Sequence, residues 1–186
     1  MGRTGIKRHV ILVGLPGAGK TTVGKLVAAA LRAPFLDLDE AIERRAGKSI
    51  PQVFAGEGED VFRALERAEM ETALAGPVGV IAAGGGWAAQ PGNLETAAAW
   101  GLTVYLRVAP EVAAGRVTLV AATGQRPADA RPLLLGDDVT TRVRELYAAR
   151  RAYYERCEAV VAAETPDPEP VALEVAQLAR TLAGWY

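Results

Sequence analysis

Gly14-Leu15-Pro16-Gly17-Ala18-Gly19-Lys20-Thr21 is the stretch that decides the fold, because it matches the pattern G-x-x-x-x-G-K-[ST] at every fixed position. It lies between a β-branched apolar run at 10–13 and an amphipathic stretch from about 20 to 32, which predicts a strand, a loop and a helix. Such glycines let backbone N–H groups point at phosphate oxygens, and the helix adds its positive dipole end. The stretch therefore predicts a nucleoside triphosphate site rather than an ordinary glycine-rich turn.

Side chains at the end of this loop suit the phosphates and their metal ion. Lys20 would reach the β- and γ-phosphates, and the Thr21 hydroxyl can ligate Mg²⁺. The motif does not say what receives the phosphoryl group. The predicted nucleotide-binding residues are Gly14, Leu15, Pro16, Gly17, Ala18, Gly19, Lys20, Thr21 and Thr22.

The composition excludes several classes of protein. The chain has 186 residues, 50% of them hydrophobic and 23% charged, which fits one domain with its own core. Its 21 Lys and Arg against 22 Asp and Glu leave a net charge of −1, so neither nucleic acid nor an anionic membrane is expected as a partner. Cys157 and His9 are single, which excludes an intrachain disulfide and the usual zinc-finger, Cys-His and Ser-His-Asp sites.

The first residues predict neither export nor a membrane anchor. They are basic, and the apolar run that follows ends at Gly14 after four residues, which is too short for a signal peptide or a membrane span. We therefore expect a cytoplasmic protein. Because no exposed apolar stripe points to a protein partner, we also expect a monomer.

Short apolar runs alternate with helical stretches along the whole chain. Further strands are predicted at 35–39, 78–83, 102–108 and 159–162, and further helices at 40–46, 59–75, 93–100, 110–121, 140–158 and 171–182. This alternation predicts a three-layer α/β/α fold, with a central parallel sheet of about five strands, as one domain over 1–186.

Two segments interrupt the alternation of strands and helices. The segment 123–136 holds Gly and Pro beside Arg126 and Arg131, and we predict that it is a mobile lid. The core of the domain would then span about 8–122 and 137–186. The segment 165–170 alternates Pro with acidic residues and is interpreted as a connection.

Two acidic residues lie close together on one predicted strand. Apolar and acidic residues alternate over 35–40, so Asp37 and Asp39 would point to the same side of the strand, about 7 Å apart. If this strand neighbours the first, both carboxylates lie at the carboxyl edge beside the phosphate loop. One could complete a water-mediated Mg²⁺ site, and the other could orient an acceptor hydroxyl and accept its proton. Solvated acids at a strand end are the alternative.

Arg63 and a second glycine cluster are further candidates. Arg63 lies at the edge of the core face of the helix predicted at 59–75, where an isolated arginine is usually a surface ion-pair partner. Gly84-Gly85-Gly86 directly follows a buried strand and permits close approach of a ligand to backbone amides. A plain flexible turn is the other interpretation of these glycines.

Two pairs of arginines lie further along the chain. Arg126 or Arg131 could swing onto the transferring phosphate from the predicted lid, or could stay solvated. Arg150 and Arg151 are neighbours in a predicted helix and point about 100° apart. At most one of this second pair is therefore expected to face the site.

Taken together, these motifs resemble the shikimate kinase family, which belongs to the nucleoside monophosphate kinase-like group of P-loop proteins, over about 10–158. The family's motifs recur here in the same order. They are Asp37-Leu38-Asp39-Glu40, Ser49-Ile50, Phe54, Gly58-Glu59, Phe62-Arg63, Glu66, Gly84-Gly85-Gly86, Arg131-Pro132-Leu133-Leu134, and Arg150 with Tyr154 four residues on.

The resemblance implies ATP-dependent phosphorylation of shikimate at its 3-hydroxyl, giving shikimate 3-phosphate and ADP in aromatic amino acid biosynthesis, with Mg²⁺ as cofactor. It implies catalytic roles for Asp39, as the base that holds the acceptor hydroxyl, and for Lys20 and Arg131, which would stabilise the transferring phosphoryl group. Thr21 would bind Mg²⁺, and Asp37 would reach the ion through water. Arg131 would also contact the nucleotide. The implied shikimate-binding residues are Asp39, Arg63, Gly84, Gly85, Gly86 and Arg150, with a substrate-binding helical region at about 40–75.

The chain also departs from the family's pattern. Ala152 stands where a Pro is usual, the segment between Arg116 and Arg131 is long, and 165–170 lacks a basic residue. Two alternatives share the phosphate loop. A gluconate or nucleotide kinase would not need Phe62-Arg63, the triple glycine and Arg150 together. The intact Lys20, Thr21, Asp37 and Asp39 argue against a regulatory or assembly module that binds nucleotide without turnover.

Overall fold

The computed structural model describes residues 7–123 and 138–186, and its centre is a five-stranded sheet. Every strand pairing is parallel, and the strand order is β2-β3-β1-β4-β5. The strands are β1 (His9–Val13), β2 (Phe35–Asp37), β3 (Val80–Ala82), β4 (Gly101–Arg107) and β5 (Ala159–Ala162). The predicted parallel sheet of about five strands is confirmed.

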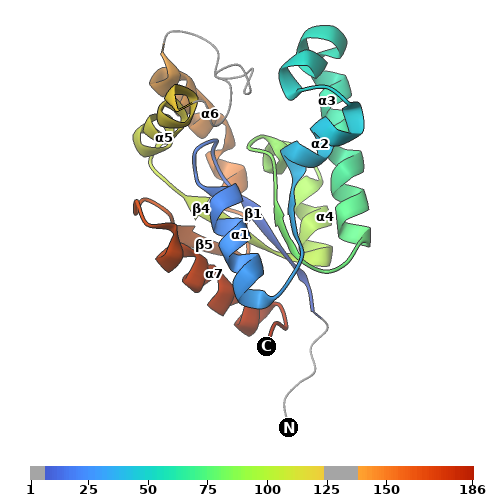
Figure 1. Cartoon of the computed structure of the whole chain (residues 1–186), viewed down its shortest axis with the longest axis vertical. Coiled ribbons are helices and arrows are strands. Elements are labelled where there is room, and N and C mark those ends of the chain that lie inside the picture. Colours follow the sequence, from blue (N-terminus) through green and yellow to red (C-terminus); the bar gives the residue numbers. More distant parts are fainter. Residues whose placement is uncertain (1–6, 124–137) are drawn as a thin grey trace.

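Helices cover both faces of the sheet, which completes the predicted three-layer fold. Helices α1 and α7 pack against each other on one face, and α4 lies on the opposite face (Figure 1). The described helices are α1 (Lys20–Leu31), α2 (Leu38–Ala46), α3 (Ile50–Ala75), α4 (Asn93–Trp100), α5 (Pro110–Ala122), α6 (Val139–Tyr154), α7 (Pro168–Leu182) and a short 3₁₀ turn, η1 (Trp87–Ala89). Within the described ranges, none of the helices is long and apolar enough to cross a membrane.

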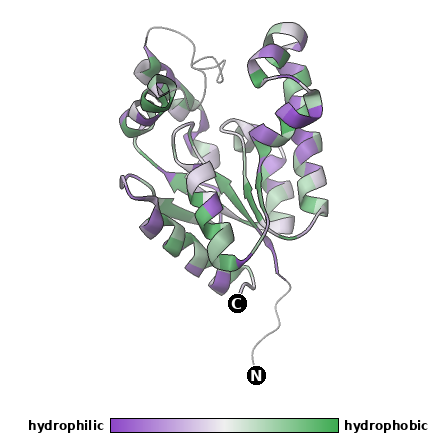
Figure 2. Cartoon of the chain, in the orientation of Figure 1, coloured by the Kyte–Doolittle hydropathy of each residue, from purple (hydrophilic) through white to green (hydrophobic). Residues whose placement is uncertain are grey.

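Strand β1 forms the centre of the core. It pairs with β3 on one side and β4 on the other, and its residues Val10 to Val13 have no exposed surface. A strand covered on both sides and both faces must be apolar throughout, which explains why its sequence shows no polar alternation. Figure 2 shows the same pattern, with hydrophobic strands inside and hydrophilic residues on the outer helices.

Several predicted boundaries are wrong for identifiable local reasons. The strand predicted at 35–39 ends at Asp37, because the Asp37 side chain accepts hydrogen bonds from the backbone N–H groups of Asp39 and Glu40 and caps α2. Helix α3 begins at Ile50, where Ser49 and Gln52 form a reciprocal capping box, and Gly58 breaks it so that its second segment begins at Glu59, as predicted.

Two further boundaries differ near the end of the chain. The connection predicted at 165–170 is wrong in its second half, because Pro168 opens α7 and Asp167 caps it. The helix predicted at 140–158, which is α6, ends at Tyr154. The strand β2 does not neighbour β1, since β3 lies between them.

The topology places the functional edge of the sheet between two helical arms. Above the carboxyl ends of the strands, α2 and α3 rise on one side and α5 and α6 on the other, while the start of β1 and the C-terminus lie at the opposite edge (Figure 1). Ligand sites in open parallel sheets lie outside the carboxyl ends of the strands. The P-loop, Asp37 and the triple glycine all follow strands at this edge.

The buried His9 side chain ties β1 to the end of α3. Its Nε2 lies 3.1 Å from the carbonyl oxygen of Leu74, and its Nδ1 accepts a hydrogen bond from the N–H of Gly79 at 3.3 Å. The Leu74 carbonyl is one of the last in its helix and has no partner within the helix. His9 therefore satisfies two buried backbone groups and fixes the long helix that carries Arg63.

We predict that His9→Leu lowers the free energy of unfolding by about 2–4 kcal/mol, because it leaves both backbone groups buried without their partner at about 1–3 kcal/mol each. Chemical denaturation followed by circular dichroism measures this change. A change below about 0.5 kcal/mol would show that the two backbone groups find other partners.

Candidate active site

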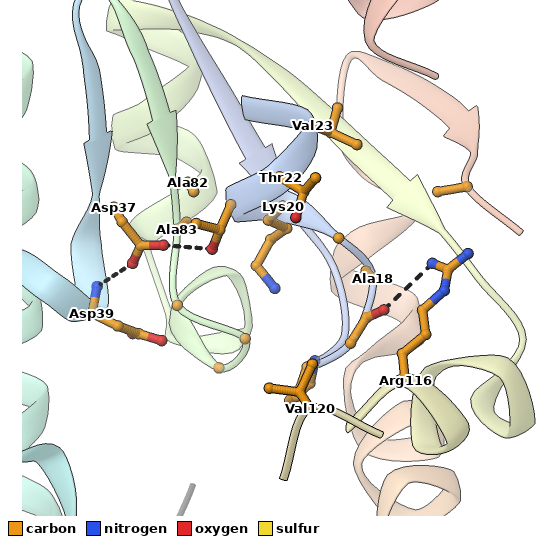
Figure 3. Close-up of a pocket in the computed structure, with 18 of the residues that line it drawn as sticks. Ala18, Lys20, Thr22, Val23, Asp37, Asp39, Ala82, Ala83, Arg116 and Val120 are labelled. Atoms are coloured by element: carbon orange, nitrogen blue, oxygen red, sulfur yellow. Dashed lines mark hydrogen bonds between the residues drawn. The ribbon is translucent and has the colours of Figure 1, made fainter. Parts of the chain in front are cut away.

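One cleft of about 770 Å³ runs across the carboxyl edge of the sheet. It is lined by the P-loop, the start of α2, the middle of α3, the glycine turn after β3 and parts of α5, α6 and α7. Figure 3 shows Lys20 between Asp37 and Asp39 on one side and Arg116 on the other. The cleft therefore joins the predicted nucleotide site to the predicted acceptor site.

The P-loop has the backbone that its sequence predicts. Gly17 has φ +86°, and a Cβ there would stand 2.3 Å from the backbone oxygen of Ala113 in α5. A side chain at this position is excluded by both conformation and space. Lys20 Nζ donates to the carbonyl oxygens of Gly14 and Leu15 at 2.9 and 3.0 Å, so the ammonium lies over the loop.

Asp37 connects the P-loop to the acceptor side of the cleft. Its Oδ2 accepts a hydrogen bond from the Thr21 hydroxyl at 2.6 Å, and its Oδ1 accepts from the backbone N–H of Asp39 at 3.0 Å. Asp37 is only 6% exposed, so both oxygens are held in fixed positions. One buried carboxylate thus fixes the first turn of α1 relative to the first turn of α2.

The Thr21 and Asp37 pair also fits a magnesium ion. A hydroxyl and a carboxylate are hard oxygen donors, and Mg²⁺ is commonly held by one or two such groups together with phosphates and water. Among the described residues, no group of three or more His, Cys, Asp and Glu side chains gathers in a way that could hold a metal ion. The donor set therefore suits an ion that arrives with a phosphate ligand.

Asp39 is close to Asp37, but the geometry predicted for the two carboxylates is wrong. Asp39 lies in the first turn of α2 rather than on β2, so the two side chains do not share a strand face. Asp39 still points into the cleft: a Cβ built on Gly84 would meet its Oδ1 at 3.1 Å. The helix start, rather than strand alternation, brings this carboxylate to the glycine turn.

Arg63 is buried rather than exposed as an isolated surface arginine would be. Its side chain is 9% exposed, and Nη1 donates to Glu66 Oε2 at 2.7 Å while Nη2 donates to Glu59 Oε1 at 3.1 Å. Burial alone would lower the pKa of Arg63, but the attraction of Glu66 and Glu59 outweighs it and raises the pKa. The guanidinium is therefore charged and paired within the cleft wall.

Glu66 is the most deeply buried acid of the cleft. Burial raises the pKa of its carboxyl, Asp39 adds to this effect, and Arg63 and Arg150 oppose it. Its Oε1 has no hydrogen-bond partner among the described residues, and a Cβ on Gly84 would meet that oxygen at 2.5 Å. No role was predicted for Glu66, although its position three residues after Arg63 on a helix already places the two side chains together.

The glycine turn is held by two side chains of α6. Arg150 Nη1 donates to the carbonyl oxygen of Gly85 at 3.0 Å, and the buried Tyr154 hydroxyl donates to the same oxygen. Burial raises the pKa of Tyr154 to about 12, so its hydroxyl remains a hydrogen-bond donor at neutral pH. Arg151 points outward and pairs with Glu155, which confirms that only Arg150 of this pair faces the site.

The two buried arginines converge on Gly86. A Cβ on this residue would stand 2.9 Å from Arg63 Nη2 and 3.2 Å from Arg150 Nη2. Only a glycine leaves room for both guanidinium groups beside the backbone. Two such groups around one point form a binding position for a carboxylate.

Arg116 is a cleft residue to which the sequence analysis assigned no role. Its Nη2 donates to the carbonyl oxygen of Thr165 at 2.8 Å, and Nη1 makes a longer contact of 3.5 Å to the carbonyl oxygen of Gly17. Thr165, Pro166 and Pro168 line the same end of the cleft, so the segment interpreted as a connection contributes to its wall. No local sequence pattern could have predicted the contact between Arg116 and Thr165, because the two residues are far apart in sequence.

Some predicted site residues lie outside the described residues. These are Arg126 and Arg131, and with them all of the predicted lid at 123–136 except Thr123. All other predicted binding residues line the cleft or form the backbone of the P-loop beside it.

Comparisons with known proteins agree with this geometry. A protein-family model for shikimate kinase matches residues 16–180. The chain is 42% identical to the shikimate kinase of Symbiobacterium thermophilum over 146 residues, which is 78% of this chain and 80% of the relative. It is 35% identical to that of Caldanaerobacter subterraneus over 90% of this chain and 94% of the relative.

Solved structures give the same result. The shikimate kinase of Acinetobacter baumannii, determined in complex with shikimate, has a TM-score of 0.85 and 31% identity, covering 94% of each chain. A gluconokinase from Sinorhizobium meliloti has a TM-score of 0.61 at 17% identity and shares only the fold. The family model and the relatives together show that the chain belongs to the shikimate kinase family.

Proposed function

We propose that the chain transfers the γ-phosphoryl group of ATP to the 3-hydroxyl of shikimate, giving shikimate 3-phosphate and ADP. The observation that supports this most directly is the distribution of charge along one cleft. A phosphate-binding loop with Lys20 lies at one end, and Asp39 lies with Arg63 and Arg150 around the glycine turn at the other. Family membership supports the same reaction.

Shikimate has one carboxylate and three hydroxyls, and the acceptor end of the cleft complements both. The paired guanidinium groups near Gly86 suit the carboxylate. The Asp39 carboxylate beside Gly84 suits a hydroxyl donor. With the carboxylate held at Gly86, the ring would lie within reach of Asp39, which lines the same cleft as the P-loop.

The chain's own residues supply most of the transfer chemistry. Asp39 would orient the acceptor hydroxyl and accept its proton, while Lys20 would move from the loop carbonyls to the phosphate oxygens. Thr21 and Asp37 would hold Mg²⁺, which neutralises phosphate charge when bound. Arg131 would add positive charge to the transferring group from the proposed lid.

Other expectations accompany this function as proposals. We propose a monomeric, cytoplasmic enzyme with shikimate and ATP as its ligands and no nucleic acid or membrane partner. A single peak at the monomer mass in size-exclusion chromatography with light scattering would support the first part, and a stable dimer at micromolar concentration would refute it.

The proposed activity is tested by measuring ADP release with Mg·ATP and a panel of acceptors. Shikimate alone should stimulate release strongly, whereas quinate, gluconate and AMP should not. Stimulation by gluconate or AMP in place of shikimate would assign a different kinase activity to the cleft. No stimulation by any acceptor, with ATP still bound, would favour a nucleotide-binding module.

We predict that Asp39→Asn folds and binds ATP but loses nearly all turnover, because the amide keeps the shape of the side chain and removes the proton acceptor. Proton-transfer groups of this kind contribute about 10²- to 10⁴-fold to the rate. Steady-state kinetics and ATP titration measure the two properties. The control is Asp60→Asn, which changes an exposed acid of α3. Near-normal turnover of Asp39→Asn would refute the role of Asp39 as the base.

Arg63→Ala and Arg150→Ala should each weaken shikimate binding by about 2–5 kcal/mol, because each removes one partner of a buried charge pair. The KM for ATP should stay close to that of the wild type. Arg151→Ala is a matched control, since this neighbour is exposed and pairs with Glu155. An unchanged KM for shikimate in both site variants would remove these arginines from the acceptor site.

Tyr154→Phe should raise the KM for shikimate by about five- to tenfold, because it removes the hydrogen bond to Gly85, worth about 1 kcal/mol. The ring keeps its stacking on Tyr105, with centroids 5.1 Å apart, so the fold is preserved. Kinetics with shikimate and a thermal melt separate the two effects. A KM equal to that of the wild type would show that Arg150 holds the turn alone.

A further inference from the structure

Glu59 is a charged neighbour of the acceptor site that the proposed mechanism does not use. It lies in α3, its side chain is 55% exposed, and it is not one of the residues that line the cleft. Its Oε1 nevertheless accepts two hydrogen bonds from Arg63, from Nε at 3.3 Å and from Nη2 at 3.1 Å. The exposed carboxylate of Glu59 thus accepts hydrogen bonds from the outer edge of the buried Arg63 guanidinium.

The N–H groups of Arg63 are divided between two carboxylates. Glu59 takes the edge formed by Nε and Nη2, and Glu66 takes one N–H of Nη1 from the buried side. A guanidinium has five N–H groups, so one N–H on each of Nη1 and Nη2 remains. Both of these nitrogens lie about 3 Å from the position of a Cβ on Gly86, so this end faces the glycine turn.

The two carboxylates that contact Arg63 reduce the repulsion between Arg63 and Arg150. Arg63 and Arg150 both reach the same point at Gly86, and two like charges at that separation repel each other when no anion lies between them. Without a restraint, the flexible side chain of Arg63 would turn toward solvent. Glu59 and Glu66 hold it on two sides, and the negative charge they add offsets the repulsion.

A break in α3 places Glu59 where it can do this. Gly58 has φ +86° and ψ 173°, a conformation open essentially to glycine alone, and it interrupts the helix directly before Glu59. The helical segment that begins at Glu59 has an acidic residue in its first turn, which the helix dipole favours. Arg63 then lies four residues on, within reach of an i,i+4 ion pair.

We infer that Glu59 is a positioning residue for acceptor binding: it holds Arg63 from outside the cleft so that the free Nη1–Nη2 end faces the substrate carboxylate. This rests on the proposed function, since it takes shikimate as the acceptor. Glu59 itself touches neither substrate nor nucleotide. Its contribution is confined to ground-state binding of the carboxylate.

The test compares Glu59→Ala, Glu59→Gln and the control Asp60→Ala, an exposed acid at the next position of the same helix. Glu59→Ala should raise the KM for shikimate by about three- to fivefold, as expected for the loss of an ion pair whose acid is half exposed, with kcat and the KM for ATP unchanged. Glu59→Gln should raise the KM less than Glu59→Ala does, because its amide oxygen still accepts from Nε and Nη2 although the negative charge is lost. Asp60→Ala should match the wild type.

A second substrate tests whether Glu59 acts through the carboxylate of shikimate. Shikimate methyl ester lacks the charge that Arg63 would bind, so Glu59→Ala and the wild type should use it equally poorly. An equal loss with ester and acid would mean that Glu59 supports the fold in general, which would overturn the inference. A KM for shikimate that is unchanged or lower in Glu59→Ala would also overturn it, the lower value showing that Glu59 competes with the substrate.

The wild type separates this inference from the function on which it rests. Wild-type protein that does not phosphorylate shikimate refutes the proposed function. Wild-type protein that does so, with Glu59→Ala unaffected, refutes the positioning role alone.

Discussion

The hydrogen bond between the Thr21 hydroxyl and the buried Asp37 carboxylate is the interaction on which the site depends. Asp37 ends β2, caps α2 and contacts the first turn of α1. Because β3 separates β2 from β1, the sheet register places the two helix starts two strands apart, and the hydrogen bond from Thr21 to Asp37 links them directly. Displacing this carboxylate would therefore affect both the phosphate loop and Asp39.

The acceptor end depends on a balance of buried charge. Two guanidinium groups lie beside one glycine, and two glutamates with Asp39 lie around them. Removing a partner from such a cluster leaves an uncompensated charge, which costs more than the pair itself contributes. Nitrogens of both guanidinium groups face Gly86, so a carboxylate ligand bound there would complete the charge balance of the cluster. The hydrogen bonds that the two guanidinium groups can donate and the charge balance of the cluster therefore both favour a carboxylate ligand.

The sequence was informative where one local rule dominates. The P-loop, the parallel strands and the expectation that at most one of Arg150 and Arg151 faces the site follow from motif spacing, buried apolar runs and helical periodicity. The position of Asp39 was predicted wrongly because Asp-x-Asp fits a strand by alternation and a helix start by capping, and the capping interaction of Asp37 prevails. The contacts of Arg116 and the adjacency of β3 to β1 depend on tertiary packing, which no local pattern records. Likewise, the glycines at 56 and 58 obscured the start of α3, although the capping box at Ser49 marks it.

The most direct measurement of the central claim is a crystal structure with shikimate and a non-hydrolysable ATP analogue bound together. The account predicts the shikimate carboxylate between Arg63 and Arg150 beside Gly86, its 3-hydroxyl within hydrogen-bond distance of Asp39, and the triphosphate on the P-loop. A carboxylate bound away from both arginines, or an acceptor hydroxyl out of reach of Asp39, would contradict it.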